Sequence, residues 1–208
     1  MNTTTLSSLL SLSEWAWRYV QQCIACVLLV VLAPLFAVLY VAVRGTSPGP
    51  FIFRQERPGY GGRTFTAMKI RTMHQGSEQA TALGVTRGAP QITRIGRILR
   101  ELKLDELPQL VNIARGQMLF VGPRPIPVAL DRELREHIPG FAMRYFVRPG
   151  LTSVGQVCVD DNGVDEQLIN DWSLRFEAEC HYLDHKSVRY DIVVIALTIL
   201  YVFRKAVR

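Results

Sequence analysis

The most apolar part of the chain runs from Tyr19 to Val43 without a charged side chain and is bounded by Arg18 and Arg44. As one straight helix this stretch would be about 37 Å long, enough to cross a bilayer core of roughly 30 Å. A secretory signal peptide is not expected, because residues 1–12 lack a basic side chain, the run is too long and no small-residue cleavage site follows. The pattern therefore predicts a membrane helix near the N-terminus.

Pro34 interrupts this apolar run. Proline removes one helical hydrogen bond and clashes with the carbonyl four residues earlier, so we expect the helix to kink or break near Ala33. The two arms would measure about 22 Å and 13 Å, and neither crosses a bilayer alone. Two arrangements stay open: a kinked spanning helix, which the segment by itself favours, and a re-entrant hairpin that returns to the leaflet it entered. The basic chain after Arg44 places the rest of the protein in the cytoplasm in either case.

The next segment predicts a β-hairpin. Residues 51–56 alternate between apolar and polar positions, residues 63–73 are rich in β-forming side chains, and the sequence between them is R-P-G-Y-G-G. Residues 45–50, G-T-S-P-G-P, have the composition of a linker. The hairpin carries basic side chains on one face and at its turn, which form either a solvated face or an anion-binding one: Arg57, Arg63, Lys69 and Arg71.

A helix is predicted after residues 75–90, which lack periodicity and are expected to form a loop. Thr93 is a candidate N-cap for this helix. The apolar positions that hold helical spacing are Ile95, Ile98, Leu99 and Leu102. Arginines recur every three residues on a neighbouring face, at Arg94, Arg97 and Arg100. This basic stripe leads directly into an acidic pair.

Two apolar patterns in the C-terminal half have more than one interpretation. Leu130, Leu134 and Ile138 form a short stripe at helical spacing that suits a core, an interface or a membrane contact. The run from Ile192 to Phe203 is about half the length that a spanning helix needs and is followed by basic residues. It is predicted to be either a core helix or a helix lying at the membrane surface.

Composition supports anionic partners and a membrane. The 208 residues carry a formal net charge of +6, and the isoelectric point is about 9.4. Such a balance suits phosphates, acidic lipids or nucleic acid, or simply keeps a protein soluble. A mean hydropathy of +0.14 is unusual for a soluble basic protein. The cysteines Cys23, Cys26, Cys158 and Cys180 do not form a disulfide framework in a chain of this length and indicate a reducing compartment.

Asp105 and Glu106 are adjacent carboxylates among leucines. Neighbouring helical residues point about 100° apart, so the two do not face each other, but one can attack while the other binds a metal. Magnesium prefers carboxylate and phosphate oxygens together. The alternative is an exposed acidic pair at a helix end.

Two arginines are held next to prolines. Arg124 lies between Pro123 and Pro125, and Arg148 precedes Pro149. Prolines restrict the backbone and leave each guanidinium little freedom, which suits a phosphate ligand. Two surface turns are the alternative. Rigid arginines, a carboxylate pair, a basic sheet face and a membrane helix together indicate phosphoryl chemistry on a lipid.

These motifs resemble one family, the small monotopic phosphoglycosyl transferases, which are bacterial sugar transferases that begin capsule, exopolysaccharide or glycoprotein glycan assembly. The similarity runs from Arg18 to the C-terminus. Its most specific parts are T-R-I-G-R-I-L-R-E-L-K-L-D-E-L-P-Q-L-V-N-I-A-R-G at 93–116 and V-G-P-R-P at 121–125. Supporting motifs are F-R-Q-E-R-P-G at 53–59, K-I-R-T-M at 69–73 and V-R-P-G-L-T at 147–152.

The resemblance implies a mechanism. Asp105 would attack the sugar-bearing phosphate of a UDP-sugar, UMP would leave, and undecaprenyl phosphate, a polyprenyl phosphate, would collect the phospho-sugar from the aspartate. Glu106 would hold Mg²⁺ against the diphosphate, and Arg18 would meet the lipid phosphate. The full set of basic residues expected to bind substrate phosphates is Arg18, Arg57, Lys69, Arg71, Arg100, Arg124 and Arg148.

The resemblance also implies an architecture. We expect an α+β, mostly helical monotopic membrane protein with a small β-hairpin and interfacial amphipathic helices. Residues 1–17 would be an N-terminal tail, residues 18–44 a re-entrant helix broken at Pro34, and residues 45–208 a catalytic domain. Because the family is anchored by such a broken helix, the hairpin arrangement becomes the favoured one. The location implied is the cytoplasmic face of the bacterial inner membrane.

Several positions depart from the family pattern. Gln21 and Gln117 stand where aspartate is usual, Ala33 replaces serine before the proline, residues 153–159 differ, and Glu179 replaces aspartate. These changes leave the donor sugar open and motivate an alternative, a weakly active or non-catalytic membrane subunit of a polysaccharide assembly complex. A nucleic-acid-binding protein is not expected, because no basic patch interleaved with aromatics is evident. The sequence leaves open whether the protein forms a homodimer.

Overall fold

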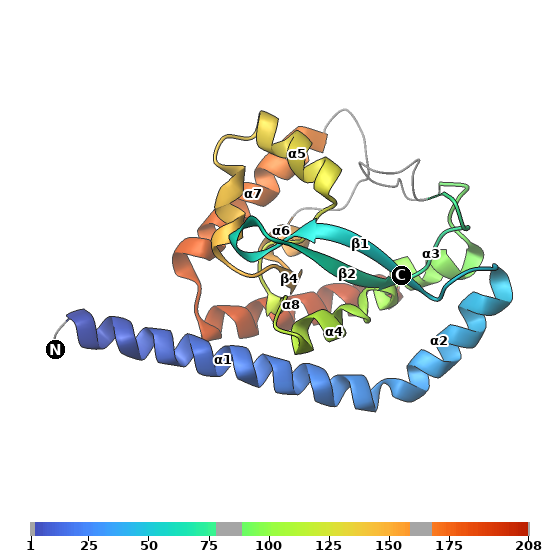
Figure 1. The fold of residues 1–208 in the computed structure, drawn as a ribbon, viewed down its shortest axis with the longest axis horizontal. Coiled ribbons are helices and arrows are strands. Elements are labelled where there is room, and N and C mark those ends of the chain that lie inside the picture. The colour runs from blue at the N-terminus through green and yellow to red at the C-terminus, as the bar shows by residue number, and fades with distance from the viewer. Residues whose placement is uncertain (1–2, 78–88, 159–167, 208) are drawn as a thin grey trace.

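The computed structural model describes the backbone of residues 3–77, 89–158 and 168–207, and side chains within 14–77, 89–158 and 168–204. The fold is mostly helical with a small antiparallel hairpin, which confirms the predicted α+β class (Figure 1). The α-helices are α1 (Thr3–Val31), α2 (Ala33–Thr46), α3 (Arg94–Glu101), α4 (Gln109–Ala114), α5 (Val128–His137), α6 (Val154–Cys158), α7 (Leu168–His185) and α8 (Val188–Val207). The strands are β1 (Ile52–Pro58), β2 (Thr64–Ile70), β3 (Leu119–Val121) and β4 (Gly150–Thr152), and 3₁₀ turns are η1 (Tyr60–Gly62), η3 (Leu104–Glu106) and η4 (Phe141–Phe146). The predicted loop at 75–90 falls largely on residues 78–88, outside the described part.

The N-terminal apolar run is broken where the proline predicts. Helices α1 and α2 meet at Leu32 and are bent by 60°. Pro34 occupies the first turn of α2, where its missing N–H costs no helical hydrogen bond. Helix α1 already begins at Thr3, so the expected tail and the first arm of the anchor form one helix. Among the described residues no single helix has the length and apolar character to cross a bilayer, whereas the bent pair 14–31 and 33–46 has both when taken together.

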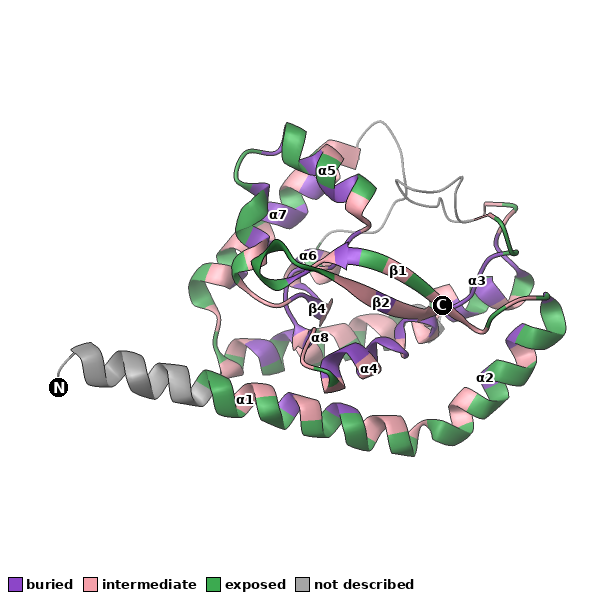
Figure 2. Cartoon of the chain, viewed as in Figure 1, coloured by how far each residue is buried: buried purple, intermediate pink, exposed green. Residues whose placement is uncertain are grey.

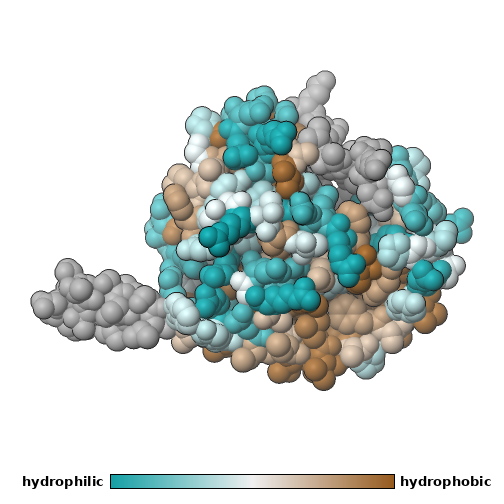
Figure 3. Space-filling model, in the orientation of Figure 1, coloured by the Kyte–Doolittle hydropathy of each residue, from teal (hydrophilic) through white to brown (hydrophobic). Residues whose placement is uncertain are grey.

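One side of the bent pair packs on the rest of the protein. Ala25 of α1 is fully buried against Leu110 and Ile113 of α4, and α2 packs against α3 and β2. Figure 2 shows the other side of both helices to be largely exposed. Its large apolar side chains include Val20, Ile24, Val27, Val30, Val31, Val38 and Val41. In Figure 3 apolar surface gathers along the edge of the molecule where these helices run.

The predicted β-hairpin is confirmed. Strands β1 and β2 pair antiparallel from Ile52 opposite Ile70 to Pro58 opposite Thr64. The turn η1 contains Gly61 with a φ of 66°, a left-handed conformation that glycine adopts at little cost. Each observed strand is close to its predicted bounds, because alternation and a Gly-rich turn are local signals.

A second, parallel pair of strands joins the two proline–arginine motifs. Strand β3 pairs with β4, Leu119 opposite Gly150 and Val121 opposite Thr152. The backbones approach so closely that a Cβ added to Gly150 would lie 2.1 Å from the Gly122 nitrogen. Glycine is therefore required here, and the motifs around Arg124 and Arg148 become neighbours through their main chains.

The structure shows where the two apolar patterns of the C-terminal half lie. Leu130, Leu134 and Ile138 are buried with Phe141 and Trp172, so the stripe belongs to a core between α5, η4 and α7. Helix α8 is longer than the predicted run and buries only one side, through Val194. Its exposed apolar side chains are Ile192, Val193, Leu197, Ile199, Leu200 and Phe203. Helix α8 is therefore a surface helix and not a core helix. The four cysteines are unpaired, as expected.

Candidate active site

The acidic pair is buried. Asp105 and Glu106 lie in the 3₁₀ turn η3 and are only 7% and 6% exposed, which excludes an exposed pair at a helix end. Helix α3 leads into this turn. Its start is capped as predicted, since the Gly96 N–H donates to Thr93 Oγ1 at 2.9 Å. Gly96 itself is required because a Cβ there would lie 2.0 Å from the Thr72 carbonyl oxygen.

Lys103 turns the chain from α3 into the acidic pair. Its φ of 57° and ψ of 18° lie in the left-handed region, which costs a non-glycine residue roughly 1 kcal/mol. Backbone outliers of this kind are concentrated at functional sites. The turn leaves the Lys103 ammonium close enough to lower the pKa of both Asp105 and Glu106. The sequence contained no sign of this conformation.

Glu106 is held by two cations. Lys69 Nζ lies 2.9 Å from Glu106 Oε1, and Arg124 donates to Oε1 at 2.6 Å and to Oε2 at 3.3 Å. Burial acts to raise the pKa of Glu106, but Arg124 and Lys69 outweigh it and hold the pKa well below the ordinary value. Glu106 is therefore an ionised carboxylate. It orients Lys69 from strand β2 and Arg124 from the loop that follows β3.

Asp105 has the opposite environment. Among the described residues its carboxylate has no hydrogen bond or ion pair. Burial raises the pKa of Asp105, and the attraction of Lys69 offsets this in part. A buried carboxylate without a partner is more basic than one in water and loses no ion pair when it attacks an electrophile. Two adjacent carboxylates with pKa values pushed apart favour distinct chemical roles.

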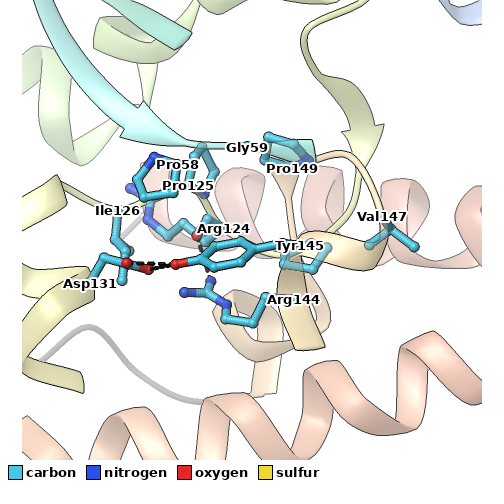
Figure 4. A pocket seen from close by; sticks show the side chains of 11 residues that line it. Pro58, Gly59, Arg124, Pro125, Ile126, Asp131, Arg144, Tyr145, Val147 and Pro149 are labelled. Atoms are coloured by element: carbon cyan, nitrogen blue, oxygen red, sulfur yellow. Dashed lines mark hydrogen bonds between the residues drawn. The ribbon is translucent and has the colours of Figure 1, made fainter. Parts of the chain in front are cut away.

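The loop that carries Arg124 is fixed by a buried ion pair. The Arg124 N–H donates to Glu179 Oε1 at 3.0 Å, and Arg144 Nε donates to Glu179 Oε2 at 2.8 Å. Arg144 also donates to the Arg124 carbonyl at 2.6 Å. Figure 4 shows Arg124 and Arg144 lining a small pocket with Tyr145, whose hydroxyl donates to Asp131. Sequence reasoning missed Arg144, because nothing local distinguishes it from other arginines.

Four of the predicted phosphate ligands gather around the acidic pair. They are Arg57, Lys69, Arg100 and Arg124. Arg57 is buried and donates to the Pro125 carbonyl, and burial with the neighbouring Arg124 lowers its pKa to about 10. Arg100 donates to Thr72 Oγ1 at 2.8 Å. Arg57 therefore supports the Arg124 loop, while the other three present charge to the carboxylates.

The contacts of the other three predicted ligands lie elsewhere. Arg71 is buried and donates to the Ser47 carbonyl at 2.7 Å, at the end of α2. Arg148 donates to the Gly116 carbonyl at 2.9 Å and stacks on Tyr60. Arg18 stacks on Trp15 at 4.4 Å and is close enough to Arg148 to help burial lower the pKa of that guanidinium. Arg18 and Arg148 therefore form a cationic pair at the start of the apolar part of α1.

Three departures from the family pattern have structural partners. Gln21 is buried and its Oε1 accepts from the Phe120 N–H at 2.8 Å, which ties α1 to β3. Gln117 Oε1 accepts from Asn112 Nδ2 at 2.8 Å. Asn112 in turn bonds the β2 backbone, and Glu179 holds the Arg124 loop as described above. Within the described part of the chain, none of these three side chains bonds to Asp105.

Magnesium fits this site only together with a phosphate ligand. The described residues contain no group of three or more histidine, cysteine, aspartate or glutamate side chains that would hold a metal alone. Glu106 Oε2 has one long contact at 3.3 Å, and a carboxylate offers about four lone-pair sites. Mg²⁺ is commonly bound by one or two carboxylates plus substrate phosphates. Glu106 therefore retains capacity for a metal in that setting.

Comparison with known proteins identifies the family to which the chain belongs. A family model described as bacterial sugar transferase matches residues 12–205, so the chain belongs to the bacterial sugar transferase family. A UDP-glucose:undecaprenyl-phosphate glucose-1-phosphate transferase of Caulobacter vibrioides is 39% identical over 84% of this chain and 65% of its own length. A transferase of the same name from Escherichia coli is 34% identical over 85% of this chain and 38% of its own.

A third relative has a different sugar in its name. The UDP-N-acetylgalactosamine-undecaprenyl-phosphate N-acetylgalactosaminephosphotransferase of Aeromonas hydrophila is 35% identical over 82% of this chain and 40% of its own length. The chain thus spans less than two thirds of the length of these relatives. Their shared acceptor and differing sugars confirm the family resemblance and leave the donor sugar open.

Proposed function

We propose that this protein transfers a sugar-1-phosphate from a UDP-sugar to undecaprenyl phosphate through a covalent intermediate on Asp105. The observation that carries the proposal is the contrast within the acidic pair. Asp105 is buried, has no hydrogen bond or ion pair with the residues that the structure describes, and has a raised pKa, whereas Lys69 and Arg124 pair with Glu106. An activated carboxylate beside an array of fixed cations is what covalent phosphoryl transfer requires.

In the first step an Asp105 carboxylate oxygen attacks the sugar-bearing phosphorus of the donor. The bond from this phosphorus to the oxygen bridging the two phosphates breaks, and UMP leaves with that oxygen and the bonding electrons. In the second step a phosphate oxygen of undecaprenyl phosphate attacks the same phosphorus. The acyl phosphate bond breaks, Asp105 is regenerated as a carboxylate, and the product is a lipid-linked diphosphate sugar.

The neighbouring residues supply charge and position. Lys69, Arg100 and Arg124 neutralise the phosphate oxygens as charge moves onto the leaving group. Glu106 keeps Lys69 and Arg124 in place and would hold Mg²⁺ together with the donor phosphates. The ion, when bound, adds neutralising charge at the diphosphate. Arg144 and Glu179 act through the Arg124 backbone and position its guanidinium.

The reaction is proposed to occur at the cytoplasmic face of the bacterial inner membrane. The exposed apolar sides of α1 and α2 and the 60° bend support a re-entrant anchor that leaves both ends on one side. The Arg18–Arg148 pair is flanked by the exposed aromatic rings of Trp15, Tyr19 and Tyr60. Aromatic and arginine side chains of this kind suit the headgroup region of a membrane. Such an anchor holds the site at the depth of the acceptor phosphate.

The test is UMP release from a panel of UDP-sugars by purified full-length protein with Mg²⁺ and undecaprenyl phosphate. We expect release with one or a few sugars, and none from Asp105→Asn. Glu177→Gln, an exposed change on α7, serves as a matched control and should keep full activity. No release from folded protein with any sugar in the panel would contradict the enzymatic proposal and favour a non-catalytic assembly subunit.

A further inference from the structure

A cavity of about 230 Å³ opens beside Glu106, between η3, the β3–β4 pair and α8. Its charged lining residues are Lys103, Glu106 and Arg175. The remaining wall is largely apolar and includes Phe120, Leu151 and Val202. The cavity therefore borders the proposed reaction site at Glu106 and is otherwise lined mostly by apolar side chains.

Helix α8 forms one side of this cavity. Ile195, Thr198, Ile199 and Val202 line it and recur at positions i, i+3, i+4 and i+7, which is one face of a helix. The Thr198 hydroxyl is paired with Thr152 at 2.7 Å and donates to the Val194 carbonyl, also at 2.7 Å. Because these hydroxyls bond each other and the backbone, this part of the wall suits an apolar occupant.

The apolar wall continues onto the surface of the protein. Ile199 lines the cavity and is 63% exposed, and the adjoining Leu200 and Phe203 are 55% and 67% exposed. An apolar chain entering from the side of α8 would therefore stay in contact with apolar side chains along its whole path. A nucleotide sugar has no segment of this character, whereas a polyprenyl phosphate has both an anionic head and an apolar tail.

The charge around Glu106 suits that anionic head. Glu106 carries a negative charge, but Lys69 and Arg124 bond to it and Lys103 lies beside it. With Arg175 and Asp105 included, four cations and two anions lie around this part of the cavity, so its charge is net positive. A lipid phosphate placed there would be next to Asp105, where the phospho-sugar is held after the first step.

We propose that this cavity is the acceptor site: the first isoprene units of undecaprenyl phosphate lie along the Ile195–Val202 face of α8, with the phosphate at Lys103 and Glu106. The inference rests on the proposed function and assigns its acceptor to a place in the fold. It places the lipid on the α8 side of Glu106, where its phosphate enters after UMP has left.

The first experiment measures the two half-reactions separately with Val202→Trp, which fills the cavity. Single-turnover UMP release without acceptor reports the donor step, and the dependence of product formation on undecaprenyl phosphate reports the acceptor step. We expect an unchanged UMP burst and a rise of about tenfold or more in the acceptor KM. Val193→Trp, which adds the same group to an exposed α8 residue that does not line the cavity, should change neither. A Val202→Trp variant that loses the UMP burst while folded, or that binds acceptor normally, would overturn the proposal.

A second experiment does not depend on turnover. A photoreactive polyprenyl phosphate, with the reactive group near the phosphate end of the tail, is cross-linked to full-length Asp105→Asn and the labelled peptides are mapped by mass spectrometry. We expect labelling of α8 within 195–202, competed by unlabelled undecaprenyl phosphate and not by inorganic phosphate. Labelling confined to α1 and α2 would overturn the acceptor site. If wild-type protein shows no UMP burst while this labelling is found, the catalytic proposal fails and the lipid site stands.

Discussion

Arg124 donates to both oxygens of Glu106, at 2.6 Å and 3.3 Å, while its own peptide N–H donates to Glu179 at 3.0 Å. One residue thus connects the proposed reaction site to a buried ion pair on α7. Prolines on either side restrict its backbone, so the guanidinium is positioned from both directions. The site is organised before any substrate binds, which is how fixed charges contribute most to phosphoryl transfer.

Glu106→Gln should weaken both stability and the donor step. The substitution leaves Lys69 and Arg124 buried without the charge that compensates them, and breaking a buried ion pair costs roughly 3–5 kcal/mol. Chemical denaturation and single-turnover UMP release measure the two effects. Glu177→Gln, an exposed change of the same kind, should leave both unaltered. A Glu106→Gln variant as stable as the wild type would contradict the proposed role of the ion pairs.

Asp105→Asn should be more stable than the wild type at neutral pH. Because burial raises the folded-state pKa of Asp105 above its unfolded value, ionising it costs more in the folded protein. Wild-type stability should fall as pH rises from the ordinary range of an aspartate through the raised folded pKa, and then level off. Asparagine lacks this loss, so above that range its melting temperature should be higher than that of the wild type, by a few degrees. A stability difference between the two proteins that does not change with pH would contradict this account.

Glu179→Gln should reduce activity although Glu179 is not proposed to contact either substrate. The substitution removes the negative charge that pairs with Arg144. It also weakens the hydrogen bond from the Arg124 N–H, so the Arg124 backbone is held less firmly. We expect a loss of several kcal/mol of stability. If Arg124 is also misplaced, kcat should fall more than the donor KM rises. Glu179→Asp, which keeps the charge, should recover part of both. Full activity in Glu179→Gln would show that the α7 ion pair does not position Arg124.

The re-entrant arrangement predicts that both ends of the bent pair stay on the cytoplasmic side. In a background with the four cysteines replaced, Thr5→Cys should resist a membrane-impermeant thiol reagent in spheroplasts and react only after permeabilisation. Thr64→Cys, at the exposed turn end of the hairpin, is the cytoplasmic control. Labelling of residue 5 in intact spheroplasts while residue 64 stays protected would establish a spanning helix.

Local features of this protein could be predicted from its sequence. The helix capped by Thr93, the β1–β2 hairpin and the break before Pro34 each depend on residues close together in the chain. The parallel β3–β4 pair could not be predicted, because three-residue strands are too short to show alternation. The Arg144–Glu179 pair joins residues 35 positions apart and also left no local pattern.

The sequence indicates which residue types form the candidate site, but not which of them contact one another. The sequence singles out the proline-flanked arginines and the acidic pair, but it does not show that Arg124 contacts Glu106 while Arg148 lies close to Arg18. The parallel β3–β4 pair, with its close backbone approach at Gly122 and Gly150, decides which of the two arginines lies next to Glu106. The left-handed Lys103 was likewise hidden, because lysine is an unusual residue for that conformation.

The most direct test of the central claim is the intact mass of the protein after mixing with a productive UDP-sugar and Mg²⁺ in the absence of acceptor. The account predicts a mass increase equal to one sugar phosphate, mapped to the peptide containing Asp105 and removed when undecaprenyl phosphate is added. Asp105→Asn should show no increase. Lipid-linked product formed at full rate by Asp105→Asn, or an adduct on another residue, would contradict the assignment of Asp105 as the nucleophile.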